Sequence, residues 1–397
     1  MSETLEQQLD EWFPRMIEWR RHLHRNPELS YRETETSRMV AEVLRKLGLE
    51  TETGIGGHGV TGLIDSGKPG PTIALRADMD ALPIRDGKSC DYASQVDGVM
   101  HACGHDAHTS VLLAAAGILK ERKEHWSGKI KLIFQPAEEM SPGGAQPMIR
   151  DGVLTGVDAI YGIHLWTPYP AGSISTRPGP FMAAADEFTI TIKGKGGHGG
   201  LPHETVDSLV VGAHLAVNLQ AIVSRNLDPT EPGVVSIGSI QAGTSFNVIA
   251  DLCTLNGTVR TFNVEVRDYI RQRLKEITRH TCAMFGAEGE VEYKLGYPPV
   301  INHERETQRV WKAAEAHADG EVFTSPLIMA AEDFAYYLQK VPGCFLFVGA
   351  GNPEKGIVHP HHHPKFDIDE SCMRTAARLF VRLAEGYTDL PVRQPGE

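Results

Sequence analysis

Residues 72–80 read Thr-Ile-Ala-Leu-Arg-Ala-Asp-Met-Asp, an apolar run that ends in acidic residues. Such a run is typical of a buried strand, because parallel strands covered on both faces are nearly continuous in apolar residues. Residues 129–134 form a second run of this kind, shortly before two adjacent glutamates, and residues 159–163 form a third, directly before His164. Each predicted strand therefore ends at acidic or histidine residues, on the edge of an open α/β sheet where ligands bind.

Helical patterns precede and separate these strands. Apolar residues recur at helical spacing over residues 5–17, and a helix is expected at about 107–120. Ser30 and Glu33 resemble a capping box ahead of another helix that reaches about residue 47. Strands that alternate with helices predict an α/β fold, with a central, mostly parallel sheet flanked by helices.

A different pattern begins near residue 185, where residues 187–193 alternate like a half-exposed strand. The elements expected after it are a helix at about 205–225, strands at 234–240 and 252–262, a helix at about 266–285 and a strand at 291–295. This β-α-β-β-α-β order is the ferredoxin-like arrangement. After two prolines the α/β pattern resumes, with an apolar strand at 344–348. We therefore predict an α/β domain formed by residues 1–184 and 297–397, with residues 185–296 inserted as a second, ferredoxin-like α+β domain.

Length and composition limit the class of protein. The chain has 397 residues, and single cores rarely grow past roughly 250–300 residues, so two domains are expected. The 39 Lys+Arg against 51 Asp+Glu give a net charge of −12, which repels nucleic acid and anionic membranes, so neither is expected as a partner. No secretory signal or membrane span is visible, and the six cysteines form no close pairs. We expect no disulfide framework and a cytoplasmic location.

The segment richest in chemistry is residues 100–109, Met-His-Ala-Cys-Gly-His-Asp-Ala-His-Thr. It holds three histidines, a cysteine and an aspartate beside a glycine that can turn tightly. Thiolate, imidazole and carboxylate groups are good ligands for zinc-like metals. One histidine alone would more often belong to a polar loop that opens a helix, but the whole cluster favours a metal site.

The second such segment is residues 135–139, Gln-Pro-Ala-Glu-Glu. Adjacent carboxylates repel, so both stay ionised only near a positive charge, which a metal can supply. One glutamate can then bind the metal while its neighbour transfers protons. The alternative interpretation is an exposed acidic turn. The buried strand predicted directly before these residues argues against it.

Three further motifs are less specific. In an extended strand Asp78 and Asp80 would face the same side, where they could orient a ligand histidine, although a capped strand end is an equal alternative. The histidine-rich tract at 359–364 fits a solvated loop as well as a metal site. The glycine-rich residues 193–200 lack the order of a phosphate loop, and their glycines more plausibly let His198 approach another group closely.

Together these segments resemble the two-metal aminoacylase/carboxypeptidase superfamily, in particular its branch of hippurate hydrolases, plant auxin-conjugate amidohydrolases and bacterial N-acyl-amino-acid deacylases. The resemblance runs from residues 19–24 and 27–30 to residues 362–366, nearly the whole chain. Its most specific parts are residues 101–105, 135–139 and 198–203.

The resemblance implies that two divalent metal ions are bound by five residues, namely Cys103, His105, Glu139, His164 and His362. His362 fits a terminal pattern of His, a small polar residue and Pro, except that His363 stands where the small residue is expected. His361 and His363 are therefore weaker candidates. The cysteine favours zinc, and manganese, cobalt and nickel also fit.

The resemblance also implies that residues 1–184 and 297–397 form the metal-binding catalytic domain and that the inserted residues 185–296 form a lid or dimerisation domain. It further implies roles for residues outside the ligand set. Glu138 would be the general base, and Asp80 would orient the site. His198 would reach the active site of a neighbouring subunit, which predicts a homodimer or a higher homo-oligomer. Asn247 and Arg260 would recognise the substrate carboxylate.

The expected activity is hydrolysis of the amide bond of N-acyl-amino acids, such as acetyl- or benzoyl-amino acids, by a water activated between two metal ions. The alternatives are a dipeptidase or carboxypeptidase of the same fold, a metal-binding protein without activity, and a cysteine hydrolase that uses Cys103. The glutamate pair argues against a purely structural metal site, which needs no spare carboxylate.

Overall fold

The computed structural model describes residues 4–315 and 319–387. The chain divides into two compact units. Unit 1 comprises Met1–Phe181, Ile301–Pro326 and Asp333–Glu397, and unit 2 comprises Met182–Val300 and Leu327–Glu332. Each unit has its own hydrophobic core, so each is described separately below.

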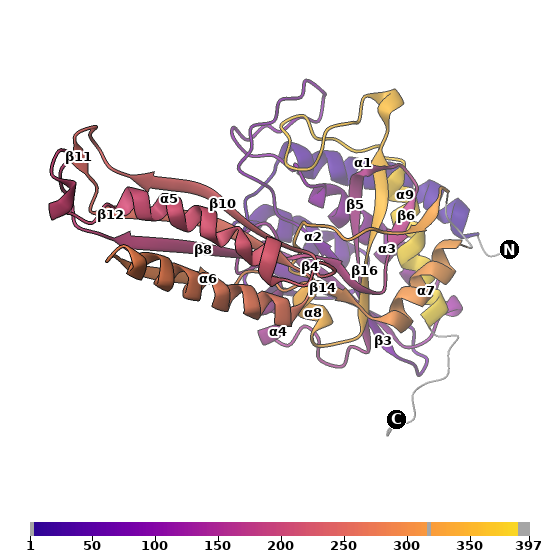
Figure 1. The fold of residues 1–397 in the computed structure, drawn as a ribbon. Helices are drawn as coiled ribbons and strands as arrows, with labels where there is room; N and C mark the ends of the chain where they lie inside the picture. Colours follow the sequence, from indigo (N-terminus) through magenta and orange to yellow (C-terminus); the bar gives the residue numbers. More distant parts are fainter. Residues whose placement is uncertain (1–3, 316–318, 388–397) are drawn as a thin grey trace. The chain divides into compact units, whose positions relative to one another are not determined.

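Unit 1 is built on an eight-stranded sheet in the order β1-β2-β4-β3-β5-β16-β6-β15 (Figure 1). Its strands are β1 Glu50–Ile55, β2 Gly59–Asp65, β3 Thr72–Asp78, β4 Lys129–Gln135, β5 Ala159–Pro170, β6 Ile174–Thr176, β15 Val322–Thr324 and β16 Gly343–Gly351. The central strands β4, β3, β5 and β16 run parallel, whereas β1, β2 and the β16–β6 pair are antiparallel. The predicted, mostly parallel central sheet is therefore confirmed.

Helices cover both faces of this sheet. The helices of unit 1 are α1 Leu5–Arg25, α2 Thr34–Lys46, α3 His105–Glu121, α4 Ala145–Arg150, α7 Glu304–Glu315, α8 Ala335–Leu338 and α9 Cys372–Tyr387. α3 packs on β3 and β5 and against α1 and α9, while α8 packs on β16 and α4. Alternate residues of β5, Tyr161 and Ile163, join the core under α3, whereas Phe334 and Phe345 fill the space beside Gly162 on the other face.

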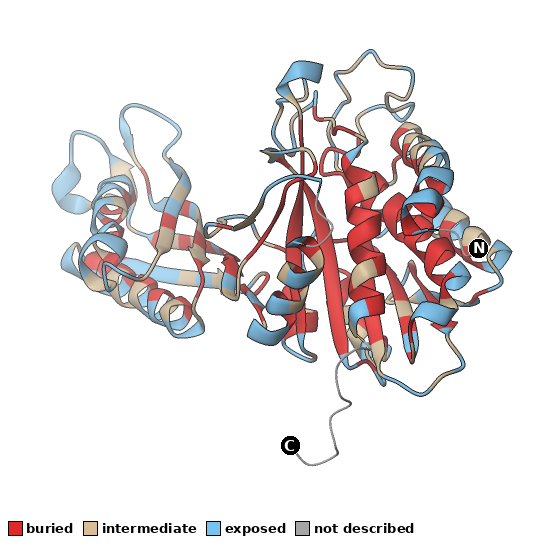
Figure 2. Cartoon of the chain, turned by 90° about the vertical axis from the view of Figure 1, so that its right-hand side faces the viewer, coloured by how far each residue is buried: buried red, intermediate tan, exposed pale blue. Residues whose placement is uncertain are grey.

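The helix α3 is buried along almost its whole length, from His105 to Leu119 (Figure 2). A helix that is apolar all round must be enclosed by other elements. Its contact with α1 is close because Gly117 has no side chain where the ring of Trp12 lies. The start of this enclosed helix is thereby held in a fixed position relative to β3 and β5.

Two local predictions are wrong. Ser30 and Glu33 form no capping box, because Ser30 donates its hydroxyl hydrogen bond to Asp80 and Glu33 makes no side-chain capping bond. The carboxylate of Glu28 instead accepts from two amides in the first turn of α2. The third strand also does not stop before His164, because β5 stays paired with β16 as far as Pro170.

Unit 2 contains β8 Ala184–Lys193, β9 Gly197–His198, α5 Ser208–Leu219, β10 Gly233–Ala242, β11 Val248–Ile249, β12 Leu252–Thr261, α6 Val264–Met284 and β13 Glu288–Lys294. Its four-stranded sheet has the order β10-β12-β8-β13, and every pair in it is antiparallel. The β-α-β-β-α-β order agrees with the ferredoxin-like prediction. The first helix is shorter than expected, because α5 ends at Leu219 and a π-helical turn follows over Ile222–Asn226. The remaining strands are β7 Gly179–Met182 and β14 Val300–Asn302, which pair with each other.

The six cysteines are free thiols. Among the described residues, no helix is long and apolar enough to cross a membrane.

Candidate metal centre

Polar side chains from five segments of unit 1 meet at the carboxyl ends of its parallel strands. The segments are the ends of β3 and β4, the middle of β5, the start of α3 and the loop that precedes α9. The groups whose donor atoms lie within 4.8 Å of one another include Cys103–His105–His164, Cys103–Glu139–His362 and His105–Glu138–Glu139. The structure thus brings together all five residues expected to bind metal, in groups that overlap at Cys103, and it places Glu138 beside them.

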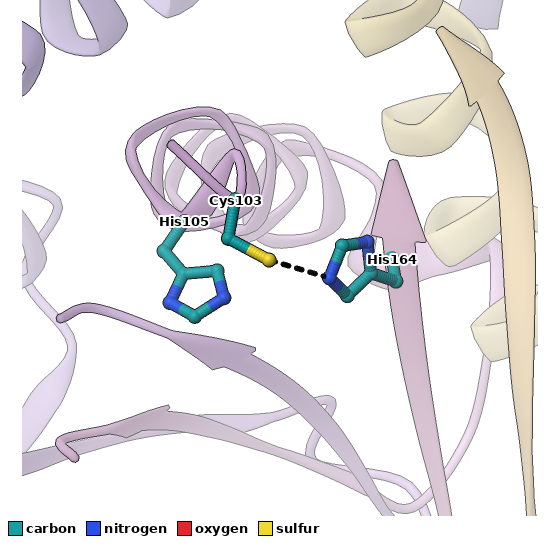
Figure 3. A group of neighbouring side chains, drawn as sticks. All are labelled: Cys103, His105 and His164. Carbon is teal, nitrogen blue, oxygen red and sulfur yellow. Dashed lines mark hydrogen bonds between the residues drawn. The ribbon is translucent and has the colours of Figure 1, made fainter. Parts of the chain in front are cut away.

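The first group joins the start of α3 to β5 (Figure 3). Cys103 Sγ lies 3.4 Å from His164 Nε2, and Figure 3 shows the ring of His105 on the other side of the same sulfur. His164 donates from Nδ1 to the carbonyl of Leu165 at 2.9 Å, which directs Nε2 towards the cysteine. Gly104 makes this arrangement possible, because its φ of 97° lies in the left-handed region that glycine adopts without strain.

An unpaired nitrogen provides the test of whether these residues fit a metal ion. His105 Nε2 is buried and has no hydrogen-bond partner among the described residues. Leaving a buried polar atom unpaired costs about 1–3 kcal/mol, so a cation beside this nitrogen would remove a penalty. The other imidazole nitrogen, Nδ1, lies 3.1 Å from Asp80 Oδ1 and fixes the ring. The donor set therefore fits a divalent ion of the zinc type.

The electrostatics of the cluster also favour a cation. Burial lowers the pKa of His105, but the carboxylates of Asp78 and Asp80 more than offset it and raise that pKa to about 10. Burial, reinforced by the charges of Glu139 and Glu138, raises the pKa of the Cys103 thiol well above its ordinary value. In the absence of a cation the cluster therefore binds protons, since it has an excess of negative groups.

The two aspartates at the end of β3 have different partners. Asp80 Oδ1 lies 3.1 Å from His105 Nδ1, and its Oδ2 accepts the amide hydrogen bond of Glu139 at 2.9 Å. Asp78 instead accepts from His108 Nδ1 at 2.6 Å. His108 Nε2 in turn accepts from the amide of Leu165, so it links α3 to β5 next to a candidate ligand. This link is not visible in the sequence, although His108 is the third histidine of residues 100–109.

The loop before α9 separates the three neighbouring histidines. His362 Nε2 lies 3.3 Å from Glu139 Oε1, while the amide of His362 donates to the carbonyl of Ala102 at 2.8 Å. His361 donates to the carbonyl of Leu165. His363 stacks on His359 with ring centroids 4.3 Å apart, and both residues are half-buried. Among the described residues, His362 is the member of this trio that belongs to a donor group.

Replacing His362 should therefore remove metal selectively. We expect His362→Ala to hold one equivalent of divalent ion fewer than the wild type, because Cys103 and Glu139 would keep only two donors for that ion. His363→Ala is the matched control and should keep the full complement. Elemental analysis after gel filtration measures both. A normal metal content in His362→Ala would remove this residue from the ligand set.

The three candidates in unit 2 lie in two places, His198 and Asn247 at the β9–β11 pair and Arg260 on the four-stranded sheet. His198 of β9 pairs with Val248 of β11, and the amide of Gly199 donates to the carbonyl of Asn247, so His198 and Asn247 are near neighbours. The Nδ1 atom of His198 accepts from the amide of Gly200 at 2.9 Å, which leaves Nε2 of this exposed ring as its outward-facing nitrogen. Arg260 lies in β12 of the four-stranded sheet and donates to the carbonyl of Met329.

An α/β sheet that presents overlapping sets of metal donors and a neighbouring carboxylate has the features of a two-metal hydrolase. Comparison with known proteins agrees with this class. The profile of Peptidase family M20/M25/M40 matches residues 74–386, and the chain belongs to this family.

Relatives cover nearly the whole chain. Thermostable carboxypeptidase 2 of Saccharolobus solfataricus is 44% identical over 385 residues, which are 96% of this chain and 97% of the relative. The N-acyl-L-amino acid amidohydrolase of Geobacillus stearothermophilus is 44% identical over 304 residues, 76% of this chain and 82% of the relative. The crystal structure of the Bacillus subtilis YXEP protein, described as a dinuclear metal-binding peptidase from the M20 family, superposes with a TM-score of 0.85 at 35% identity, covering 96% of this chain and 99% of that one.

The family and these relatives establish the reaction class. The chain is a metal-dependent amidohydrolase whose donor cluster supports two divalent ions. The alternatives of an inactive metal-binding protein and of a cysteine hydrolase that needs no metal are thereby set aside.

Proposed function

We propose that this protein hydrolyses the amide bond of N-acyl-amino acids, with Glu138 as the general base. The observation that carries the proposal is the position of Glu138. It is 6% exposed, next in sequence to the candidate ligand Glu139, and within one donor group with Glu139 and His105. A general base must lie within hydrogen-bond reach of the water that it deprotonates, and a water at this cluster would satisfy that condition.

The proposed ligands of the two ions are Cys103, His105, Glu139, His164 and His362. Zinc is the proposed native metal, because a thiolate and several imidazoles suit a borderline ion, and manganese, cobalt and nickel are the competitors. When bound, divalent ions supply Lewis acidity and lower the pKa of an associated water. Asp80 holds the ring of His105 in orientation throughout.

The proton path uses Glu138 twice. It removes a proton from the attacking water as the new bond to the amide carbon forms. It then delivers that proton to the nitrogen of the leaving amino acid as the carbon–nitrogen bond breaks. His198 is proposed to donate a hydrogen bond from Nε2 to the oxyanion that forms on the amide oxygen, since its Nδ1 already accepts from Gly200.

The proposed substrate carries a free carboxylate on its amino-acid half. Asn247 offers an amide donor and Arg260 a guanidinium, and such groups recognise carboxylates. The relatives named N-acyl-L-amino acid amidohydrolase and N-acetyl-L-cysteine deacetylase support an acyl-amino acid. The relative named thermostable carboxypeptidase 2 supports the alternative, a peptide cleaved next to its carboxyl end.

We also propose that unit 2 joins two copies of the chain. Its helix α5 exposes the apolar residues Leu209, Val210 and Val217, and Val217 is 70% exposed. Beside α5, the strand β10 lies at the edge of the four-stranded sheet. An exposed edge strand next to an apolar helix face is a surface that a second copy can cover. In such a dimer His198 would serve the active site of the neighbouring subunit.

The test is hydrolysis of N-acetyl- and N-benzoyl-amino acids, with dipeptides alongside, by metal-stripped protein. We expect amino-acid release to return only when Zn²⁺, Mn²⁺, Co²⁺ or Ni²⁺ is added. Preference for dipeptides would favour the peptidase alternative. Folded protein with two bound ions that releases no amino acid from any of these compounds would contradict the proposal.

A further inference from the structure

The turn that carries Glu138 and Glu139 has an unusual backbone. Ala137, the residue before Glu138, has a φ of 52°. This left-handed conformation is disfavoured for a residue with a side chain, because Cβ crowds the following carbonyl oxygen. Such a residue persists only where its surroundings hold it, and these residues concentrate at functional sites. The contacts of Ala137 therefore decide where Glu138 points.

The group that holds Ala137 is the carboxyl of Glu33. The amide of Ala137 donates to Glu33 Oε1 at 2.7 Å, and Glu33 is 0% exposed. The other oxygen, Oε2, is buried without a hydrogen-bond partner among the described residues. Burial, together with the nearby charge of Asp80, raises the pKa of Glu33 to about 7. A buried carboxyl with one oxygen left without a hydrogen-bond partner is costly for stability, which argues that it serves another purpose.

The short segment that contains Glu33 contacts the same turn at further points. Tyr31 donates from its hydroxyl to the carbonyl of Met140 at 3.1 Å. Ser30 donates to Asp80 Oδ2 at 2.6 Å, and that oxygen also accepts from the amide of Glu139. The segment formed by residues 30–33 thus reaches the turn on both sides of Glu138, and Glu33 makes the contact on the strained side.

We infer that Glu33 is a positioning residue for Glu138, because its carboxyl fixes the amide of Ala137 in the left-handed conformation that orients the general base. The inference rests on the proposed function of Glu138. Among the described residues Glu33 belongs to none of the donor groups, so it would act on the site through the turn. The amide of Glu139 donates to Asp80, a contact that does not involve Glu33. Loss of the Glu33 carboxyl should therefore disturb proton transfer by Glu138 more than metal binding by Glu139.

The principal variant is Glu33→Met, which keeps the volume of the side chain but removes the acceptor. We expect kcat to fall by about 10- to 100-fold, the loss associated with misplacing a catalytic group by about 1 Å. KM and the content of two metal ions should change little. Glu33→Gln keeps an acceptor oxygen and should retain most of kcat. Should Glu33→Met not fold, Glu33→Ala replaces it in every comparison.

A second substitution tests whether Glu33 positions Glu138 or only stabilises the folded protein. Glycine adopts positive φ without a Cβ clash, so Ala137→Gly should make the turn less dependent on Glu33. We expect the kcat loss from Glu33→Met to be at least about fivefold smaller in the Ala137→Gly background than in the wild type. Glu28→Ala is the matched control, since its carboxylate accepts from amides at the start of α2 and does not bind the turn.

Amide hydrogen exchange gives a readout that needs no activity. The amide of Ala137 should exchange faster in Glu33→Met than in the wild type, and its rate should stay unchanged in Glu28→Ala. Unchanged exchange in Glu33→Met, or an equal kcat loss in both backgrounds, would overturn the inference. If the wild type with two bound ions hydrolyses none of the acyl-amino acids, the proposed function fails, while the exchange rates still decide whether Glu33 holds the turn.

Discussion

Glu138→Gln is expected to lower kcat by about 10²–10⁴-fold, the usual contribution of general acid–base catalysis. The glutamine amide fills the same space but cannot accept a proton from water or return it to the leaving amine. Glu138 lies in one donor group with Glu139 and His105 and is almost fully buried, so the substitution removes the carboxylate that we propose as the base. Turnover of a good N-acyl-amino acid at saturating metal measures the effect.

The control for this experiment is the metal content. Glu138→Gln should keep both ions, because the proposed ligand of the pair is Glu139, whereas Glu139→Gln should lose metal as well as activity. Elemental analysis of both variants separates loss of the base from loss of the ions. Unchanged turnover in Glu138→Gln would exclude this residue as the base, and loss of metal from that variant would make it a ligand instead.

His198→Ala is expected to abolish most activity alone and to regain it in mixed dimers. Removing one donor to an oxyanion costs about 10²–10³-fold in kcat. If His198 serves the neighbouring subunit, a dimer of one His198→Ala chain and one Glu138→Gln chain has one complete site. Equal mixing after dissociation should then restore about a quarter of the wild-type turnover, since half the dimers are mixed and each has one site.

This mixing experiment has a direct comparison. A chain that carries both Glu138→Gln and His198→Ala, mixed with Glu138→Gln, can form no complete site in any arrangement and should stay inactive. If the first mixture also stays inactive at every ratio while mixed dimers are shown to form, each subunit works with its own residues. The proposed role of unit 2 in sharing active sites would then be wrong.

The sequence predicts the parts of the fold that depend on local pattern. The apolar runs before Asp78, Glu138 and His164 correspond to β3, β4 and β5, because a strand buried on both faces has a distinctive composition. The candidate ligands could be named together only through the family resemblance, because His164 and His362 lie far in sequence from the cluster at residues 100–109. The structure brings these residues together at one edge of the sheet. Residues that bind the same pair of metal ions must lie close together in this way.

The details that could not be predicted depend on partners far along the chain. Ser30 could have capped α2, but Asp80, fifty residues away, accepts its hydroxyl hydrogen bond instead. The choice among neighbouring histidines depends on the left-handed backbone of His362, with a φ of 63°, and on the Leu165 carbonyl that engages His361. Neither partner is visible in the local sequence, because each contact is made only once the sheet has formed.

The wide spacing of the proposed metal ligands along the chain has a consequence for biosynthesis. Cys103 and His105 leave the ribosome early, but His362 follows only after the whole of unit 2 has been translated. Chains grow at about 5–20 residues per second, so the early donors wait many seconds for the last one. During that interval the nascent chain contains the Cys103 thiol and the His105 imidazole but lacks His362, so the proposed ligand set is incomplete. Ion selection is therefore a late event, governed by the metals available around the finished chain.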